Sequence, residues 1–443
     1  MIKKTFTYFL GIIIIAYIFL GPTLFKKYWV DYRQIYENEE EKARWKGIIT
    51  FWDYPKYDTI TGNSYSYINQ RIKEFEKAHP GVFIEYRSLE PHSGNMTLKA
   101  ALKIGANPDI APVGSDWYFI SSGAMEALDE FISLEERNDF LEGGISSCSA
   151  NDILYGIPWS RQAYTLLLNT DIFEERNIEL PKNGQWGYEE FLESLKGLTK
   201  ENKKTSKGEI FGLCGSMDFG FYNIFGILMC DGAKIIDNAT GKYCFDSPEA
   251  ISGLKKLCDL KNHHKVLYSD IGNISQKEAF NMFLSGKAAV FMGDAWMVSY
   301  LKNIGSGHDI NFTTAYYPIG EAEYPVYLKD IYHSYGVFKQ DDRDKREMCI
   351  EFIKHLTSRE LQDELKKLGY FPVRKSSINM YQKDKEMYTI QKGLDYARDI
   401  PRHKKWWEIY EVLQYNILEA MNEDKTPEEA LNNAKEQVER LFH

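Results

Sequence analysis

Short apolar runs alternate with amphipathic stretches along most of this chain. Residues 48–52 form a compact apolar run, and residues 68–78 place hydrophobic side chains on one face of a helix that a His-Pro-Gly sequence ends. Residues 82–86 are the next apolar run. A strand, a helix and a strand in this order predict a parallel sheet covered by helices and entered by a right-handed crossover.

The same rhythm recurs toward the carboxyl end. The pattern predicts further helices and strands, with helices at 98–104, 279–286 and within 345–368, and strands at 108–113 and 288–292. Trp406 and Leu413 lie on one face of a later helix. Thr426 and Glu429 form a capping box around Pro427, so the last helix is expected to begin there. The whole pattern is typical of an α/β protein.

Residues 155–200 carry the most informative segment. A loop at 155–161 precedes an apolar strand at 164–168, a turn at Asn169, a chain break at 181–187 and a helix from Tyr188. Together with later blocks at 283–296, 335–338, 354–360 and 368–374, this order resembles family 1 extracellular solute-binding proteins, the maltose-binding-protein-like receptors of bacterial ABC importers. The resemblance covers nearly all of residues 47–443.

The resemblance implies a two-lobe fold of the periplasmic-binding-protein type II class, with three hinge crossings. Each lobe would be a mainly parallel sheet flanked by helices. The first lobe would comprise residues 47–162 with 333–375, and the second would comprise residues 163–332 with 376–443. It also implies a binding protein rather than an enzyme.

The amino terminus predicts an export signal or a membrane anchor. Lys3 and Lys4 precede a run of mostly apolar residues that ends near residue 25, about one hydrocarbon thickness if helical. There is no small-x-small cleavage site, and the first cysteine is Cys148, so the lipobox common in Gram-positive members of the family is missing. We therefore expect residues 1–25 to be an uncleaved anchor and residues 26–46 a polar juxtamembrane spacer, with the body outside the cell.

Composition excludes some function classes. The net charge is −10 without a basic stripe, so a nucleic-acid partner is not expected. The six cysteines show neither a C-x-x-C pair nor metal-type spacing, although a bridge such as Cys244 to Cys258 stays open. The chain contains no GxSxG, HExxH, GxGxxG or Walker sequence, and we expect no cofactor and no metal.

Aromatic and polar residues occur together where predicted strands end. Open α/β sheets bind ligands beyond the carboxyl ends of their strands. Sugars suit such pairs, because their C–H faces can lie on an indole while their hydroxyls bond to carboxylates and guanidinium groups. The predicted ligand-binding residues are Trp52, Asp53, Asp116, Trp117, Trp159, Arg161, Asp218, Phe221, Asp294, Trp296 and Tyr335. The alternative roles are helix capping, turn formation and core or hinge packing, and for Arg161 an ion pair with a surface acid.

These expectations predict a monomeric extracytoplasmic receptor that captures a sugar or oligosaccharide between its lobes and delivers it to an ABC permease. Three other functions stay open on the sequence. The loop acids Asp53, Asp116 and Asp294 could bind a polyamine or another cationic solute. Carboxylates that meet in space could make the chain a membrane-anchored glycan-degrading enzyme. A sugar sensor that partners a membrane kinase would carry the same lobes.

Overall fold

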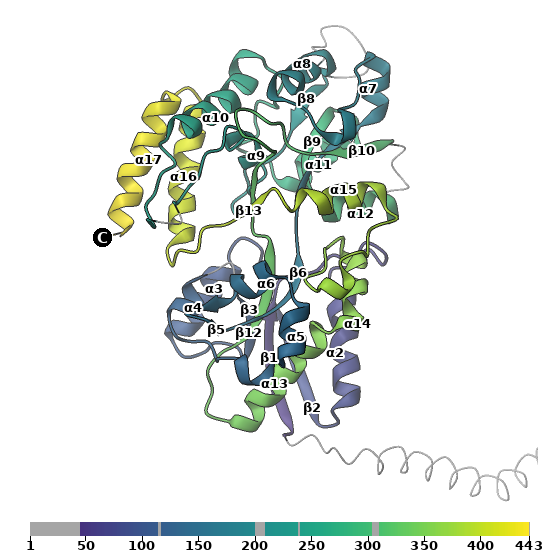
Figure 1. The fold of residues 1–443 in the computed structure, drawn as a ribbon, viewed down its shortest axis with the longest axis vertical. Coiled ribbons are helices and arrows are strands. Elements are labelled where there is room, and N and C mark those ends of the chain that lie inside the picture. The colour runs from purple at the N-terminus through teal and green to yellow at the C-terminus, as the bar shows by residue number, and fades with distance from the viewer. Residues whose placement is uncertain (1–44, 114–116, 200–208, 238–239, 304–309, 443) are drawn as a thin grey trace, which may run out of the picture.

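The computed structural model describes residues 45–113, 117–199, 209–237, 240–303 and 310–442. Two lobes stack along the long axis of the molecule (Figure 1). The predicted leader at 1–25 and nearly all of the predicted spacer at 26–46 lie outside these residues. Among the helices that are described, none combines the length and the apolar character needed to span a bilayer.

The first lobe is built on a five-stranded sheet of order β2-β1-β3-β12-β6. Its strands are β1 (Gly47–Asp53), β2 (Val82–Ser88), β3 (Ile110–Val113), β6 (Ile157–Arg161) and β12 (Tyr332–Val337). Its helices are α2 (Ser66–Ala78), α3 (Gly94–Lys103), α4 (Trp117–Ser121), α5 (Leu134–Asp139), α6 (Glu142–Ser147), α13 (Arg343–Leu356) and α14 (Arg359–Gln362). A small ribbon of β4 (Ser149–Ala150) and β5 (Ile153–Leu154) completes the lobe.

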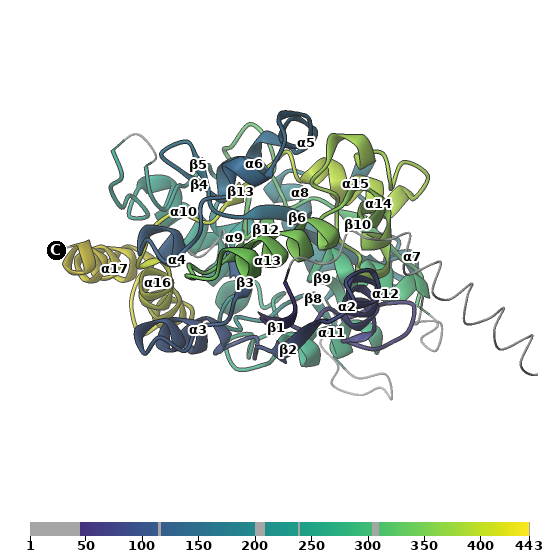
Figure 2. The ribbon, with the colours of Figure 1, turned by 90° about the horizontal axis from the view of Figure 1, so that it is seen from below.

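The second lobe contains a four-stranded sheet of order β10-β7-β9-β8. Its strands are β7 (Tyr164–Asn169), β8 (Phe211–Cys214), β9 (Ala288–Asp294) and β10 (Phe312–Ala315), and β11 (Tyr327–Lys329) pairs separately with β13 (Ala397–Asp399). Its helices are α7 (Thr170–Arg176), α8 (Tyr188–Leu198), α9 (Phe225–Leu228), α10 (Pro248–Cys258), α11 (Gln276–Leu284), α12 (Ala295–Asn303), α15 (Lys385–Gly393), α16 (Trp406–Met421) and α17 (Pro427–Phe442). The last two lie side by side at one flank of this lobe (Figures 1 and 2).

The two-lobe α/β class is confirmed, but the sheets are mixed rather than mainly parallel. In the first lobe β12 runs antiparallel to both of its neighbours, and in the second lobe β7 does the same. Both strands enter their lobe from the hinge and therefore run away from it. The other strands of the two sheets end at the hinge side, so a strand arriving from the opposite lobe has to be antiparallel to them.

Each lobe has its own hydrophobic core. The first core draws on residues between 49 and 159 and between 335 and 373, and the second draws on residues between 163 and 331 and between 371 and 438. Every residue of β7 and β9 is buried, which explains why both strands appear in the sequence as continuous apolar runs. The chain passes between the cores near residues 162, 332 and 375.

Several local expectations are confirmed. The helix expected over 68–78 is α2, which buries Ile68, Ile72 and Phe75, although Ala78 is exposed. The capping box opens α17, since Glu429 N donates to Thr426 Oγ1 at 3.2 Å and Thr426 N donates to the Glu429 carboxylate at 2.9 Å. All six cysteines are free thiols, and the Cys244–Cys258 bridge left open above is not formed.

Candidate functional site

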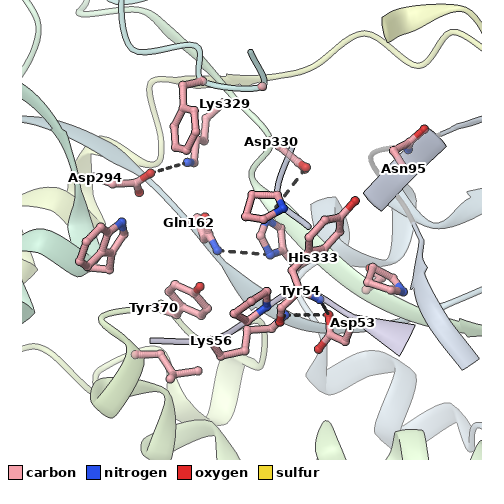
Figure 3. A pocket seen from close by; sticks show the side chains of 18 of the residues that line it. Asp53, Tyr54, Lys56, Asn95, Gln162, Asp294, Lys329, Asp330, His333 and Tyr370 are labelled. Atoms are coloured by element: carbon pink, nitrogen blue, oxygen red, sulfur yellow. Dashed lines mark hydrogen bonds and ion pairs between the residues drawn. The ribbon is translucent and has the colours of Figure 1, made fainter. Parts of the chain in front are cut away.

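A cavity of about 420 Å³ lies between the lobes and is lined by residues from both. Its volume is within the range of small-molecule sites, roughly 300–1,000 Å³. Figure 3 shows the side chains around it. Strands end at this level in both lobes, so the loops that follow them supply the walls.

Asp53, the last residue of β1, organises the wall of the first lobe. Its side chain is fully buried. Oδ1 accepts from Lys56 Nζ at 2.7 Å and from Tyr54 N at 2.8 Å, while Oδ2 accepts from the hydroxyl of Tyr335 at 2.7 Å. Burial of an ion pair is tolerated only when such hydrogen bonds satisfy both partners. Both oxygens of this carboxylate are therefore already hydrogen-bonded within the protein.

Aromatic rings continue this wall. The indole of Trp159 stacks on the ring of Tyr335 with centroids 5.5 Å apart, and it meets the ring of Tyr370 edge to face at 5.8 Å. Lys56 Nζ lies 5.5 Å from the Trp159 ring. Burial raises the pKa of the Tyr335 and Tyr370 hydroxyls, so both stay protonated and can donate hydrogen bonds.

Asp294, the last residue of β9, has the corresponding place in the second lobe. Its Oδ2 accepts from Lys329 Nζ at 2.8 Å, and the ammonium group lies 3.9 Å from the ring centroid of Tyr164. The other oxygen, Oδ1, has no hydrogen-bond partner among the residues that the structure describes. Asp294 therefore keeps one acceptor that a ligand could use.

Trp296 lies on the first turn of α12, directly after Asp294. Its ring is half-buried and contacts Phe280 and Tyr300 of its own lobe at 6.2 and 6.4 Å. It also meets Tyr57 of the first lobe at 5.8 Å, and Asn303 Nδ2 donates to Thr59 Oγ1 across the same gap at 2.9 Å. The two lobes thus already touch at this side of the cavity.

The hinge supplies a third group of polar side chains. Gln162 Nε2 lies 3.3 Å from His333 Nδ1, and His333 Nε2 lies 4.0 Å from the Asp330 carboxylate. Burial, together with the ammonium groups of Lys56 and Lys329, lowers the pKa of His333 to about 3. The imidazole is consequently neutral at physiological pH, and its Nδ1 can accept the hydrogen bond from the amide.

Comparison with known proteins identifies the family. Residues 70–389 match the sequence profile of the bacterial extracellular solute-binding proteins. The chain belongs to this family. A maltotriose-binding protein of Pyrococcus abyssi is 24% identical over 348 residues, which cover 74% of this chain and 69% of that protein.

Solved structures share the fold. An ABC substrate-binding protein from Listeria monocytogenes in complex with cycloalternan superposes with a TM-score of 0.75 at 16% identity, covering 90% of this chain and 99% of that chain. Maltose-bound MalE3 of T. maritima gives a TM-score of 0.75 at 20% identity, covering 89% and 99%. The protein is therefore an extracytoplasmic solute-binding protein and not an enzyme, which removes the glycan-degrading alternative.

In this solute-binding protein the cavity collects about half of the residues expected at the site. Six of them line it: Asp53, Trp159, Phe221, Asp294, Trp296 and Tyr335. Asp116 lies outside the described residues. The remaining four are placed elsewhere, each for a recognisable reason.

Trp52 and Trp117 do not reach the cavity. Neighbouring residues of a strand point to opposite faces, so Trp52 points away from the side of β1 that carries Asp53, and its ring lies 4.2 Å from the Arg87 guanidinium. The ring of Trp117 lies 5.8 Å from the guanidinium of Arg402.

Arg161 and Asp218 support the backbone instead of lining the cavity. Arg161 is buried at the hinge, where its Nε donates to the carbonyl of Pro372 at 2.9 Å. Asp218 does not line the cavity; it accepts at 2.7 Å from the backbone N–H of Gln276, the first residue of α11, and so caps that helix.

The sequence reasoning missed residues that the structure brings to the cavity. Among them are Lys56, Gln162, Lys329, His333, Tyr370 and Trp407. Gln162 lies between Arg161 and the strand predicted at 164–168, so its position near the hinge was a usable signal. Trp406 is buried on α16 and packs in the core of the second lobe. Its neighbour Trp407 points in a different direction, because consecutive residues of a helix are about 100° apart around its axis, and its ring reaches the cavity.

Proposed function

We propose that this protein captures an uncharged sugar or oligosaccharide in the cavity between its lobes and delivers it to an ABC permease. The supporting observation is that one cavity holds aromatic rings beside polar groups, and that lysines balance the charge of its two buried acids. Trp159, Trp296 and Phe221 offer apolar faces for sugar C–H groups. Asp294 Oδ1 and the Tyr370 hydroxyl offer an acceptor and a donor for sugar hydroxyls.

Three acids (Asp53, Asp294 and Asp330) and two lysines line the cavity, and the pairing of the two buried acids favours an uncharged ligand over a polyamine. Asp53 and Asp294 are each paired with a lysine, through Lys56 and Lys329. A cationic solute would have to approach two ammonium groups, and like charges repel strongly where water is excluded. The names of similar proteins agree, since they include maltotriose, maltose and mannotriose binders.

Closure of the lobes is the proposed transport signal. We assign residues 47–162 with 333–375 to the first lobe and 163–332 with 376–443 to the second. The extent of the two cores supports these bounds except at Phe371, which packs in the second core. A sugar that touches both lobes stabilises the closed state by the contacts that exist only there. The closed form is then presented to the permease, and the protein acts as a monomer.

We further propose that the apolar run near the amino terminus anchors the body to the outer face of the cell membrane. Its length, and the lack of a cleavage site or lipobox, support this assignment. Full-length protein is expected in the membrane fraction after carbonate extraction. A chain that starts at residue 45 is expected in the soluble fraction.

Calorimetric titration with maltose, maltotriose and mannotriose tests the function, with putrescine as the cationic competitor. Trp296→Ala is expected to weaken sugar binding by roughly thirtyfold, about 2 kcal/mol, because a ring that stacks on the ligand is lost. Trp45→Ala is the matched control, since that half-buried indole bonds to Asp342 at the far end of the first lobe.

Unchanged melting temperatures would show that both variants are folded. Equal affinity of Trp296→Ala and Trp45→Ala would contradict the assignment of the site. Binding of putrescine in place of every sugar would contradict the assignment of the ligand.

A further inference from the structure

Three aromatic rings bound the ligand cavity on one side. The ring of Tyr57, in the loop between β1 and α2, lies 5.8 Å from the ring of Trp296 and 5.9 Å from the ring of Tyr300. Trp296 and Tyr300 belong to α12, at the edge of the second lobe that faces the first lobe (Figure 1). Tyr57 and Trp296 line the cavity. We call Tyr57, Trp296 and Tyr300 the end wall.

Two further contacts join the first lobe to α12 outside the cavity. Asn303, the last residue of α12, donates from Nδ2 to Thr59 Oγ1 at 2.9 Å, and neither residue lines the cavity. Gly369 of the first lobe has a φ of +67° and approaches α12 closely. A Cβ on Gly369 would lie 2.6 Å from Trp296 Cα and 2.8 Å from Ser299 Oγ. A ligand that reaches the end wall therefore meets packed protein instead of solvent.

The loop that carries Tyr57 is held by its own hydrogen bonds. Asp58, the next residue, is buried. Its Oδ1 accepts from Ile60 N at 2.8 Å, and its Oδ2 accepts from the hydroxyl of Ser66 at 3.0 Å. Tyr57 therefore has a fixed place in the wall before any ligand arrives.

We propose that the end wall limits how far an oligosaccharide extends toward α12, and that Tyr57 sets this limit. The inference rests on the proposed function of the cavity and deepens it, because it places one end of the ligand against the wall. A terminal sugar unit can lay a C–H face on these rings, whereas a further unit would collide with them.

The position of Tyr57 makes it the specificity-determining member of the wall. It comes from the first lobe, so its truncation opens the wall without changing α12. Its side chain is half-buried and belongs to neither hydrophobic core. Burial raises the pKa of its hydroxyl, with Tyr300 and Asp58 adding to the effect. The hydroxyl therefore stays protonated and can donate to a terminal sugar hydroxyl.

Tyr57→Ala tests the proposal through the length of the sugar that binds best. The probes are maltooligosaccharides and mannooligosaccharides of two to six units, with glucose and mannose as single units. Calorimetric titration gives, for each variant, the shortest sugar that reaches the highest affinity. Tyr57→Val is a second variant that opens the wall, and Tyr57→Phe keeps the ring.

Tyr65→Ala is the matched control. Tyr65 lies at the end of the same loop, its ring meets that of Tyr86 at 6.4 Å, and it does not line the cavity. Melting temperatures equal to that of the wild type would show that the variants are folded.

Tyr57→Ala and Tyr57→Val are expected to bind best a sugar one unit longer than the wild-type optimum. Their affinity for this longer sugar should be about fivefold higher than for the wild-type optimum, which corresponds to one further neutral hydrogen bond of about 1 kcal/mol. Tyr57→Phe and Tyr65→Ala should keep the wild-type length.

An unchanged optimal length in both Tyr57→Ala and Tyr57→Val would overturn the role of the end wall, even where affinity falls. A longer optimum in Tyr65→Ala as well would also overturn it, because the effect would then not depend on the wall. A wild-type protein that binds no sugar of either series would instead overturn the proposed function, on which the end wall rests.

Discussion

The two lobes present an acid to the same cavity in different ways. Asp53 ends β1 and Asp294 ends β9, and each pairs with a lysine. Asp53 also accepts from Tyr54 and Tyr335, so both of its oxygens are used within its own lobe. Asp294 Oδ1 has no partner in the described part of the chain. Corresponding positions at two strand ends therefore hold one acid with both oxygens used and one acid with an oxygen left for a ligand.

The tryptophans next to these acids differ for a geometric reason. Trp52 directly precedes Asp53 on a strand, and adjacent strand residues cannot face the same side. Trp296 follows Asp294 by two positions after the chain has turned into α12, so acid and ring both face the cavity. The first lobe obtains its stacking ring from Trp159 on β6 instead.

The largest effect is expected from Asp53→Asn. This change leaves the Lys56 ammonium buried without its carboxylate, which costs about 3–5 kcal/mol in the free energy of unfolding. Urea denaturation measures it. The control is Glu193→Gln, whose ion pair with Lys196 is exposed and contributes less than about 1 kcal/mol. Equal losses in the two variants would show that Asp53 is not structural.

Asp294→Asn should lower sugar affinity, an effect that Asp53→Asn should not have directly because both oxygens of Asp53 are used within the protein. Loss of a hydrogen bond between a sugar hydroxyl and a charged acceptor costs about 1.5–3 kcal/mol, or roughly tenfold to a hundredfold in affinity. The same change leaves the buried Lys329 ammonium without its carboxylate, so stability should fall as well, with the contact to the Tyr164 ring as a partial offset. Calorimetry with the best-bound sugar measures the change. Wild-type affinity in Asp294→Asn would show that Asp294 Oδ1 does not accept a hydrogen bond from the ligand.

A smaller effect is expected from the pH dependence of His333. Its pKa is about 3 in the folded protein and about 6.5 in an unfolded chain, so between these values the unfolded chain binds more protons. Stability should therefore fall by about 1 kcal/mol as the pH drops from 6 to 5. His333→Gln should lack this loss.

The comparison of wild type with His333→Gln isolates this group from Asp399. Burial raises the pKa of that carboxyl to about 6, so its contribution has the opposite sign, but it is present in both proteins. Parallel stability curves for the two proteins between pH 6 and pH 5 would show that His333 is not held neutral by its surroundings.

The smallest effect is expected from Trp52→Phe. The Trp52 ring packs against Arg87 outside the cavity, and a cation–π contact at such a site contributes about 0.5–1 kcal/mol. Sugar affinity should change less than about twofold, whereas Trp296→Ala should change it strongly. A large loss of affinity in Trp52→Phe would place a ligand contact on the other face of β1.

Local structure could be predicted because it depends on patterns within the chain. The apolar runs of β1, β7 and β9, the amphipathic face of α2 and the capping box of α17 all follow from periodicity and from short-range hydrogen bonds. The order of these elements was also enough to indicate the family and its two lobes. The leader at residues 1–25 and Asp116 stay predictions.

Only the tertiary structure decided which polar groups meet. Lys56 and Lys329, more than 270 residues apart, both reach the cavity beside His333, and Gln162, His333 and Tyr370 come to it from three separate segments of the chain. Strand direction in the mixed sheets was also decided by the side from which β7 and β12 enter. Such facts depend on how distant segments pack, whereas sequence periodicity reports only which face of a segment avoids water.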